Sequence, residues 1–519
     1  MLNTQSLKKD SLKKRYFYKL FSNFVGILFN LVSQAIIPRG LGPEAYGNYS
    51  FLTNFFTQMT GFSDMGASTC FYTKLSQRPK EQGIVSFYFI FTGIIFVLIS
   101  SFVFISMAFG VYHLIWPGQK MLFIYLALGL GIVMWLAQVI SFMTDAYGLT
   151  VSGELLKGLQ KFLGLLILIW LYVTHYLKLG AFFAYNYLVT IILLLFLITL
   201  IRNNGYLRRG EFSLSVARIK SYISEFWQYC NPLLTYSLVG LIACIFDRWI
   251  LQVYGGSAQQ GFYSLSYQIG AICFLFTGAM APLFMRELSI AHANNDLERM
   301  RQMFRRYMPI LYAITAYFSC FVAVTADKAV YIFGGSLFSG AVIPVAIMAF
   351  YPIHQTYGQL SSSVFYATSR TKVYRNIGIF FILLGVPITY LLIAPHDKMG
   401  LNAGAIGLAA KMVLLNIIGV NVQLYFNAKQ LRFNYWSYLW HQIITVGILF
   451  SLAISTNFVV THLLKFSGKI IVFFVSGVIY SALVAIVIYM LPAILGMRRE
   501  DILSFIGECK GRLGFSAKG

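Results

Sequence analysis

The chain has 519 residues, of which 58% are hydrophobic and only 11% are charged, and its mean hydropathy is +0.71. A soluble protein of this length needs many more charges on its surface, so this composition excludes one and indicates a membrane protein. The formal net charge of +23 does not indicate nucleic-acid binding, because the basic residues cluster beside apolar segments.

Apolar segments long enough to cross a hydrocarbon core of ~30 Å follow one another along nearly the whole chain. They predict an all-α polytopic membrane protein with fourteen transmembrane helices. The approximate centres of these helices are Leu28, Phe56, Phe96, Met134, Leu166, Leu193, Val239, Phe274, Phe318, Val345, Leu384, Val413, Leu449 and Val478.

The predicted helices divide the chain into six parts. We expect an N-terminal segment at 1–16, a lobe of helices 1–6 at 17–205, a linker at 206–226, a lobe of helices 7–12 at 227–427, helices 13–14 at 428–492 and a tail at 493–519. The linker alternates apolar with basic and serine residues, which favours an amphipathic helix on the membrane surface.

Basic residues also predict the orientation in the membrane. The segments on one side hold 31 of the 40 Lys and Arg, the opposite connections hold seven, and two lie inside helices. The positive-inside rule therefore places both termini in the cytoplasm. The opposite connections, such as Pro38–Tyr46 and Tyr254–Gln260, are predicted to be short glycine-rich turns with no extracytoplasmic domain.

One motif occurs twice. LGPEAYGNYS at 41–50 is matched by GGSAQQGFYS at 255–264, with a constant offset of 214 residues. The recurring residues are Gly42, Gly47, Tyr49 and Ser50, which return as Gly256, Gly261, Tyr263 and Ser264. Each copy joins two long apolar segments, so the repeat predicts two similar halves, as in a transporter that works by alternating access.

Asp64 lies in the second predicted helix, on a face that is polar over several turns. This face comprises Asn54, Thr57, Gln58, Gly61, Asp64 and Ser68. An ionised carboxylate that faces lipid costs several kcal/mol, so the face is expected to contact protein or a water-filled cavity. Asp64 is interpreted as either a helix-packing residue or an acid that couples transport to an ion, and Gln58 as a polar cavity residue.

Three basic residues lie inside the predicted helices or at their ends: Arg39, Arg248 and Lys411. Lys411 is about eleven residues from either end of its helix, near the bilayer midplane. Each of the three either forms a buried ion pair or lines a cationic cavity that receives an anionic group such as a pyrophosphate. Asp64 and Asp247 are the candidate acids of such pairs.

The tenth predicted helix carries a dense polar run between His354 and Ser363, which favours a cavity wall that includes His354 and Gln359. The sequence has no glycine-rich phosphate loop, no His/Glu metal spacing and no nucleophile elbow. No catalytic residue, metal or cofactor is therefore predicted, and coupling to H⁺ or Na⁺ is left open.

Three runs of sequence resemble one family of transporters. PRGLGPEAYGNYS at 38–50, GFSDMGAS at 61–68 and DRWILQVYGGSAQQGFYSLSYQ at 247–268 resemble Wzx-type flippases. These form the polysaccharide-transporter branch of the multidrug/oligosaccharidyl-lipid/polysaccharide (MOP) exporter superfamily. The resemblance implies a MATE-like fold, with two six-helix lobes related by a pseudo-two-fold axis and two further C-terminal helices. It also implies that Arg39, Asp64, Asp247 and Arg248 are signature positions.

The activity implied by the resemblance is the flipping of a lipid-linked oligosaccharide, undecaprenyl-pyrophosphate-linked, across the bacterial inner membrane for surface polysaccharide (lipopolysaccharide) biosynthesis. The implied partners are this substrate, membrane lipids and other polysaccharide assembly proteins, and not nucleic acid.

Two other function classes are compatible with the same residues. A cation-coupled multidrug or small-molecule antiporter would share the fold, but it would need an acidic cavity for cationic drugs. A membrane glycosyltransferase or ligase would need a sizeable catalytic loop, and the predicted connections are too short for one. We therefore expect a transporter and not an enzyme.

Overall fold

The computed structural model describes residues 12–79, 81–206, 216–464, 466–497 and 500. Within these ranges all regular secondary structure is helical, as predicted. The chain divides into two compact units, Met1–Gly261 and Phe262–Gly519, which are described one at a time. Parts of three predicted segments, at 1–11, 207–215 and most of 493–519, lie outside the described residues.

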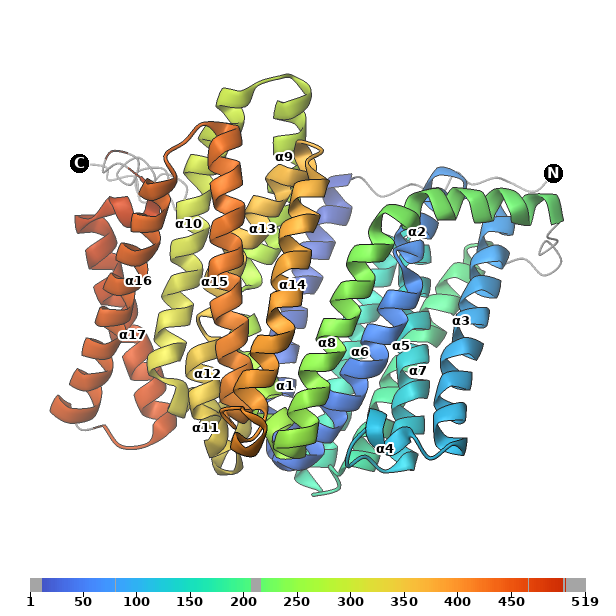
Figure 1. The fold of residues 1–519 in the computed structure, drawn as a ribbon, viewed down its shortest axis with the longest axis horizontal. Helices are drawn as coiled ribbons and strands as arrows, with labels where there is room; N and C mark the ends of the chain where they lie inside the picture. Colours follow the sequence, from blue (N-terminus) through green and yellow to red (C-terminus); the bar gives the residue numbers. More distant parts are fainter. Residues whose placement is uncertain (1–11, 80, 207–215, 465, 498–499, 501–519) are drawn as a thin grey trace, which may run out of the picture. The chain divides into compact units, whose positions relative to one another are not determined.

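The N-terminal unit is a bundle of long helices (Figure 1). They are α1 (Leu12–Asp64), α2 (Ala67–Gln77), α3 (Gln82–Ala108), α4 (Tyr112–Ile115), α5 (Met121–Ala146), α6 (Thr150–Val173), α7 (Leu179–Asn203) and the part of α8 (Val216–Ile272) that precedes Phe262. α1 packs on α5 and α6, and α5 packs on α7. Aromatic side chains fill the core, including the buried Trp116 between Phe55 and Phe56.

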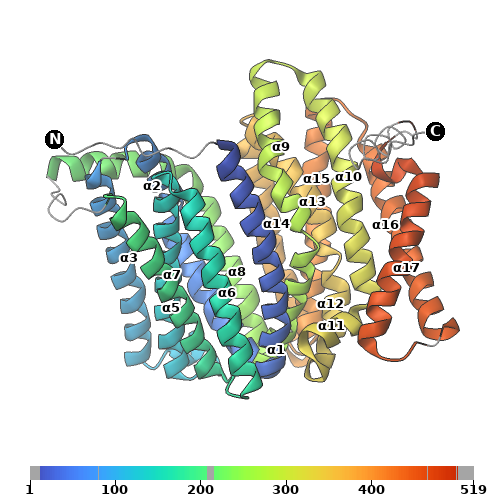
Figure 2. The ribbon, with the colours of Figure 1, turned by 180° about the vertical axis from the view of Figure 1, so that it is seen from behind.

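The C-terminal unit holds the remaining helices, which are also visible from behind in Figure 2. They are α9 (Leu275–Ala293), α10 (Leu297–Val324), α11 (Ala326–Gly334), η1 (Ser336–Ala341), α12 (Val342–Met348), α13 (Tyr351–Ala367), α14 (Thr371–Ile393), η2 (His396–Lys398), α15 (Gly404–Leu431), α16 (Tyr435–Phe458), η3 (Val459–Leu463), α17 (Lys469–Met490) and η4 (Pro492–Leu495). α13 is central, because it packs on α9, α10 and α15, whereas α16 packs between α10 and α17.

Ten of the described helices are long and apolar enough to cross a membrane, or eleven if the bent pair Ser336–Met348 and Tyr351–Ala367 is one span. Of the predicted helix centres, only Phe274 lies outside a helix, at the break between α8 and α9. α1 contains two predicted helices in one continuous element, and α8 contains the seventh and the start of the eighth.

The predicted turns at Pro38–Tyr46 and Tyr254–Gln260 are wrong in extent. Helical backbone continues through both ranges, and the only non-helical residues are Gly42 in α1 and Gly256 in α8. The glycine content suggested turns, but only one glycine in each range leaves the helical conformation, and Pro43 begins the second arm of α1, where the N–H that proline lacks would have no helical partner. The two apolar arms of each helix therefore meet at a single residue.

The first part of α8 runs across the ends of other helices of its unit before the chain turns to run beside them (Figure 1). The Glu225 carboxylate pairs with Lys74 Nζ at 3.3 Å and with the Arg78 guanidinium at 2.7 Å. Partial burial raises the pKa of the Glu225 carboxyl, but the hydrogen bonds from these two cations outweigh that effect and hold the pKa below its usual range. The pairs fix the end of α2 to this part of α8.

Candidate functional site: polar groups within the two helical units

The two copies of the repeated motif have the same backbone conformation at their first glycine. Gly42 has φ 74° and ψ 171°, and Gly256 has φ 72° and ψ −174°. This region of φ and ψ is essentially confined to glycine, since a Cβ would clash with the backbone there. The repeat in sequence is thus a repeat of one bend between two helical arms.

The second glycine of each copy packs against the backbone of the other copy. A Cβ on Gly47 would lie 1.7 Å from the Ser257 carbonyl oxygen, and a Cβ on Gly261 would lie 2.2 Å from the Pro43 carbonyl oxygen. Pro43 and Ser257 differ by the same 214 residues as the two glycines, so the contact is reciprocal. Only glycine permits two helices to cross this closely.

Side-chain amides and a hydroxyl surround this crossing. Gln119 Nε2 donates to Asn48 Oδ1 at 2.7 Å, and the Ser257 hydroxyl donates to the same oxygen at 2.5 Å. Gln252 Nε2 donates to Ser257 Oγ at 3.0 Å and to the Pro117 carbonyl oxygen at 3.1 Å. These residues were not predicted as a group, because they come from different segments and are not separated by a regular number of residues in the sequence.

Arg248 lies on α8, eight residues before Gly256. Its guanidinium donates to Gln260 Oε1 at 3.0 Å, and Gln260 Nε2 donates back to the Arg248 carbonyl oxygen. Gln260, on the other arm of α8, is fully buried, so this exchange ties the two arms across the bend. Arg39 and Asp247 are half-buried, and both have polar partners.

Asp64 is buried and accepts several hydrogen bonds. Tyr88 Oη donates to Oδ1 at 2.9 Å, the Ser68 backbone N–H donates to the same oxygen at 3.0 Å, and the Ser68 hydroxyl donates to Oδ2 at 2.7 Å. Met65 and Gly66 have φ 47° and 83°, so the helix breaks directly after Asp64 and restarts as α2. The carboxylate stabilises this new helix start, where backbone N–H groups lack helical partners.

The polar face predicted around Asp64 is therefore divided. Thr57 and Gly61 are exposed, Gln58 is half-buried, and nothing lies within 4 Å of a Cβ built on Gly61. Asp64, at the end of the same face, instead points into the unit toward α3. A role for Asp64 in ion coupling stays a prediction.

Lys411 lies in α15 of the C-terminal unit, with only 7% of its surface exposed. Its stem runs along α14, where a Cβ on Gly385 would lie 2.9 Å from Lys411 Cε and 3.2 Å from Nζ. Lys411 has an interaction partner in the structure. The missing side chain at Gly385 provides the space for this cation, which lies seven residues after the start of α15 and 20 before its end, so the predicted position about eleven residues from either end is wrong.

His354 and Gln359 lie on α13, as the polar run predicts. Among the described residues, His354 Nδ1 and Gln359 Oε1 are buried without a hydrogen-bond partner. The His354 ring packs edge-on to the Tyr312 ring of α10 at 6.1 Å between centroids. The two side chains therefore lie in the interior of the C-terminal unit, and their role in a substrate cavity stays a prediction.

Other buried polar groups of this unit come from several helices, and of these only Thr356 and Tyr357 belong to the predicted polar run. Thr277, Thr315 and Thr356 come from three helices, and their hydroxyls lie 3.0–3.3 Å apart. The Tyr312 and Tyr357 hydroxyls have no hydrogen-bond partner within the described residues. Thr277, Tyr312 and Thr315 lie on α9 and α10, so no spacing in the sequence could have linked them to the polar run of α13.

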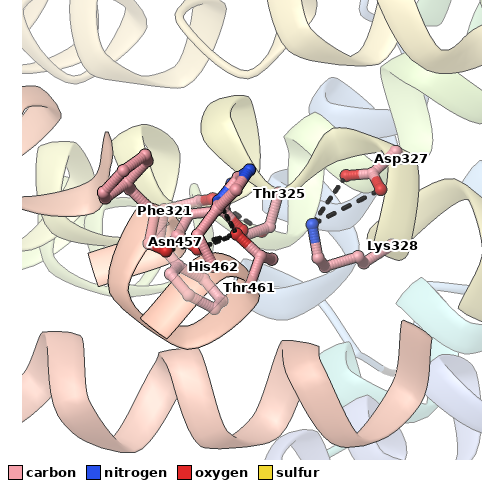
Figure 3. Close-up of polar contacts among 8 residues, drawn as sticks. Phe321, Thr325, Asp327, Lys328, Asn457, Thr461 and His462 are labelled. Atoms are coloured by element: carbon pink, nitrogen blue, oxygen red, sulfur yellow. Dashed lines mark hydrogen bonds and ion pairs between the residues drawn. The ribbon is translucent and has the colours of Figure 1, made fainter. Parts of the chain in front are cut away.

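A buried cation at another place in the C-terminal unit was also missed. Lys328 of α11 is 7% exposed, and its Nζ lies 3.1 Å from Asp327 Oδ1 (Figure 3). In the same view Thr461 donates to the Asn457 carbonyl oxygen at 2.7 Å and contacts His462 Nδ1 at 2.8 Å. Asp327 and Lys328 are neighbours in the sequence, so no helical spacing indicated that they form an ion pair.

A family model for polysaccharide biosynthesis proteins matches residues 12–286, just over half of the chain. The chain belongs to the polysaccharide biosynthesis protein family. The matched range contains both copies of the repeated glycine motif, together with Asp64 and Arg248. The family resemblance predicted from the sequence is confirmed. None of the curated proteins that were compared matches the chain.

Solved structures confirm the fold class. The chain is similar to the lipid II flippase MurJ in an inward closed conformation, with 15% identity over 92% of this chain and 99% of that chain and a TM-score of 0.63. It is also similar to an inward-facing MATE family multidrug resistance transporter of the MOP superfamily, with 16% identity over 78% and 95% of the two chains and a TM-score of 0.59. A MOP superfamily transporter from Pyrococcus furiosus, titled for a binding pocket of reverse polarity, is 16% identical over 80% and 94% of the chains, with a TM-score of 0.51.

Proposed function

We propose that this protein flips an undecaprenyl-pyrophosphate-linked oligosaccharide from the inner to the outer leaflet of the bacterial plasma membrane, with both termini in the cytoplasm. The observation that carries the proposal is the combination of a polysaccharide biosynthesis family match with the fold of MOP superfamily transporters. The substrate must be a lipid-linked intermediate, because glycans are assembled on a carrier that cannot cross the bilayer unaided.

The positions of the basic residues support an anionic substrate. Arg248 and Lys411 lie deep within helices α8 and α15, and Arg39 lies near the bend of α1. Guanidinium and ammonium groups form strong charge-assisted hydrogen bonds with phosphate oxygens. In this proposal such cations bind the pyrophosphate, while the prenyl chain stays in lipid.

The bends at Gly42 and Gly256 support alternating access. Each bend allows one helical arm to change direction relative to the other by rotation at a single residue. In this proposal the close crossing of Gly47 and Gly261 forms and separates as access alternates.

The fold also suits a multidrug antiporter, as the MATE likeness illustrates. The two functions differ in the charge of the substrate, and Arg39, Arg248 and Lys411 favour an anion. Coupling to H⁺ or Na⁺ through Asp64 is part of the proposal for either function.

The experiment uses a bacterial strain that lacks its own flippase and accumulates a lipid-linked oligosaccharide. Expression of the protein is expected to make the oligosaccharide accessible to periplasmic enzymes. Lys411→Ala should reduce this accessibility, whereas Lys429→Ala, an exposed lysine at the end of the same helix, should not. Oligosaccharide that stays in the inner leaflet, despite normal expression and a matched carrier, would overturn the proposal.

A further inference from the structure

A large cavity lies within the C-terminal unit, and neither Lys411 nor His354 lines it. Its volume is about 760 Å³, and it lies between α10, α16 and the η4 turn that follows α17. Cavities of ~300–1,000 Å³ are the size that binds small organic ligands. The function proposed above uses none of the residues that line this cavity.

One part of the cavity wall is apolar. It is formed by Pro309 of α10, by Trp440, Ile444 and Ile448 of α16, and by Leu491 and Ile494. Trp440 is 60% exposed and Ile444 is 52% exposed, so this wall continues onto the outer surface of the unit. In a membrane protein that surface contacts acyl chains.

The other part of the wall is basic. Arg301 and Arg305 line the cavity, and none of its described lining residues is acidic. Arg301 is held in place, because its Nε donates to the Leu431 carbonyl oxygen at 2.8 Å and its guanidinium pairs with Glu298 at 2.5 Å. Arg305 is exposed at the same site, one helical turn further along α10.

The walls of the cavity are fixed to one another without a ligand. His441 Nε2 lies 2.8 Å from the Ile494 carbonyl oxygen, which joins α16 to η4. A Cβ on Gly496 would lie 2.8 Å from Pro309 Cβ, so the end of η4 packs tightly on α10. Binding of a ligand in this cavity therefore requires little ordering of the protein, and the small entropic cost favours binding.

The cavity lies at the level of a membrane surface. Trp436 and Trp440, in the first turns of α16, are 65% and 60% exposed, and exposed tryptophans typically lie at the headgroup level. Ile448 is 13 residues after Tyr435, which places it ~20 Å along the helix at 1.5 Å per residue. A bound molecule can thus reach from the headgroups into the hydrocarbon layer.

We propose that this cavity is a binding site for an anionic phospholipid that is not the transported substrate. Its phosphate lies against Arg301 and Arg305, and an acyl chain lies against Ile444, Ile448 and Leu491. Charge complementarity decides the occupant, since a basic pocket between transmembrane helices on the cytoplasmic side selects anionic headgroups. The basic segment around Arg301 is on the side that the charge distribution predicts to be cytoplasmic.

The test measures lipid binding to the purified full-length protein by native mass spectrometry, with phosphatidylglycerol or phosphatidylcholine added. We expect preferential retention of phosphatidylglycerol, and a loss of about tenfold or more in that preference in the Arg301→Ala/Arg305→Ala variant. The matched control is Arg286→Ala/Arg306→Ala, which removes two exposed arginines that do not line the cavity. Ile448→Trp, which fills the apolar part, should also reduce binding while thermal unfolding shows that the protein stays folded.

Several results would overturn the proposal. Equal loss in the control variant would mean that binding depends only on surface charge. Complete competition by glycerol phosphate would mean that the site binds a free anion and not a lipid. Binding that appears only after removal of residues 501–519 would assign the cavity to the chain's own tail. Stoichiometric displacement by a polyprenyl pyrophosphate at equal concentration would assign it to the transported substrate.

Discussion

Replacement of Gly47 by alanine tests the close crossing of the two repeated motifs. In the wild-type structure the built Cβ would lie 1.7 Å from the Ser257 carbonyl oxygen and 2.8 Å from the Gly261 nitrogen. Both atoms belong to the backbone, so no side-chain rotation can relieve the clash. The crossing must widen by about 1.3 Å to reach 3.0 Å, a separation below which real Cβ atoms are essentially never found.

The expected cost follows from two opposing effects. Overpacking of a tight contact costs ~1–3 kcal/mol. Alanine is favoured over glycine within a helix by ~1 kcal/mol, which offsets part of that cost. The net result should be destabilisation of this conformation by up to ~2 kcal/mol. The loss should appear as a lower unfolding temperature and as slower transport.

Gly61→Ala is the matched control, because Gly61 lies on the same arm of α1 and a Cβ there has nothing within 4 Å. It should leave stability unchanged or raise it by up to ~1 kcal/mol. The assay is thermal unfolding in a lipid nanodisc, followed by flipping in vesicles. A Gly47→Ala protein as stable and as active as Gly61→Ala would refute the close crossing.

Three further substitutions test other parts of the site. Asp64→Asn keeps an acceptor oxygen and should fold, but its transport should be slower and less dependent on pH. Transport at the wild-type rate with an unchanged pH profile would exclude the coupling role. Glu225→Gln should lower stability at pH 7 by up to ~1 kcal/mol, as for exposed ion pairs. The pKa of Glu225 is lowered in the folded state, so the stability from its ion pairs is complete above the pKa of ~4.3 in the unfolded chain. This stability is lost as the pH falls through the lowered pKa. The variant and the wild type should therefore have the same stability at strongly acidic pH. Gly385→Ala should displace the flexible end of Lys411 and slow transport without unfolding the protein.

The controls separate function from folding. Asp64→Ala should lower stability by ~1–2 kcal/mol, because α2 loses its N-terminal hydrogen bonds and the Tyr88 hydroxyl loses its acceptor. A difference between Glu225→Gln and wild type that persists at strongly acidic pH would contradict the ion-pair explanation. Gly385→Ala with normal flipping would show that the position of Lys411 does not matter.

Local patterns in the sequence predicted the helices and the repeated bend. Apolar length marks a transmembrane helix whatever its neighbours are, and glycine is favoured where a positive φ is combined with an extended ψ, as at Gly42 and Gly256. The extent of the bend was overestimated, because the glycine-rich ranges 38–46 and 254–260 are typical of turns but are helical here except at Gly42 and Gly256.

Contacts between distant segments could not be predicted. Gly61 and Asp64 are three residues apart in α1, yet Gly61 is exposed while Asp64 is buried and accepts hydrogen bonds from Tyr88 and Ser68. The reciprocal contact of Gly47 with Ser257 depends on how two helices cross, which one sequence does not specify. A single sequence shows which residues are unusual but not what they meet.

The most direct test of the proposed function is flipping by the purified protein in vesicles. The vesicles contain a fluorescent polyprenyl-pyrophosphate oligosaccharide in both leaflets, and an added glycosidase that cannot cross the membrane cleaves only the outer pool. With the protein present, the inner pool should also become cleavable, more slowly for Lys411→Ala and at the wild-type rate for Lys429→Ala. An inner pool that stays protected, while the same vesicles transport a cationic dye, would contradict the account.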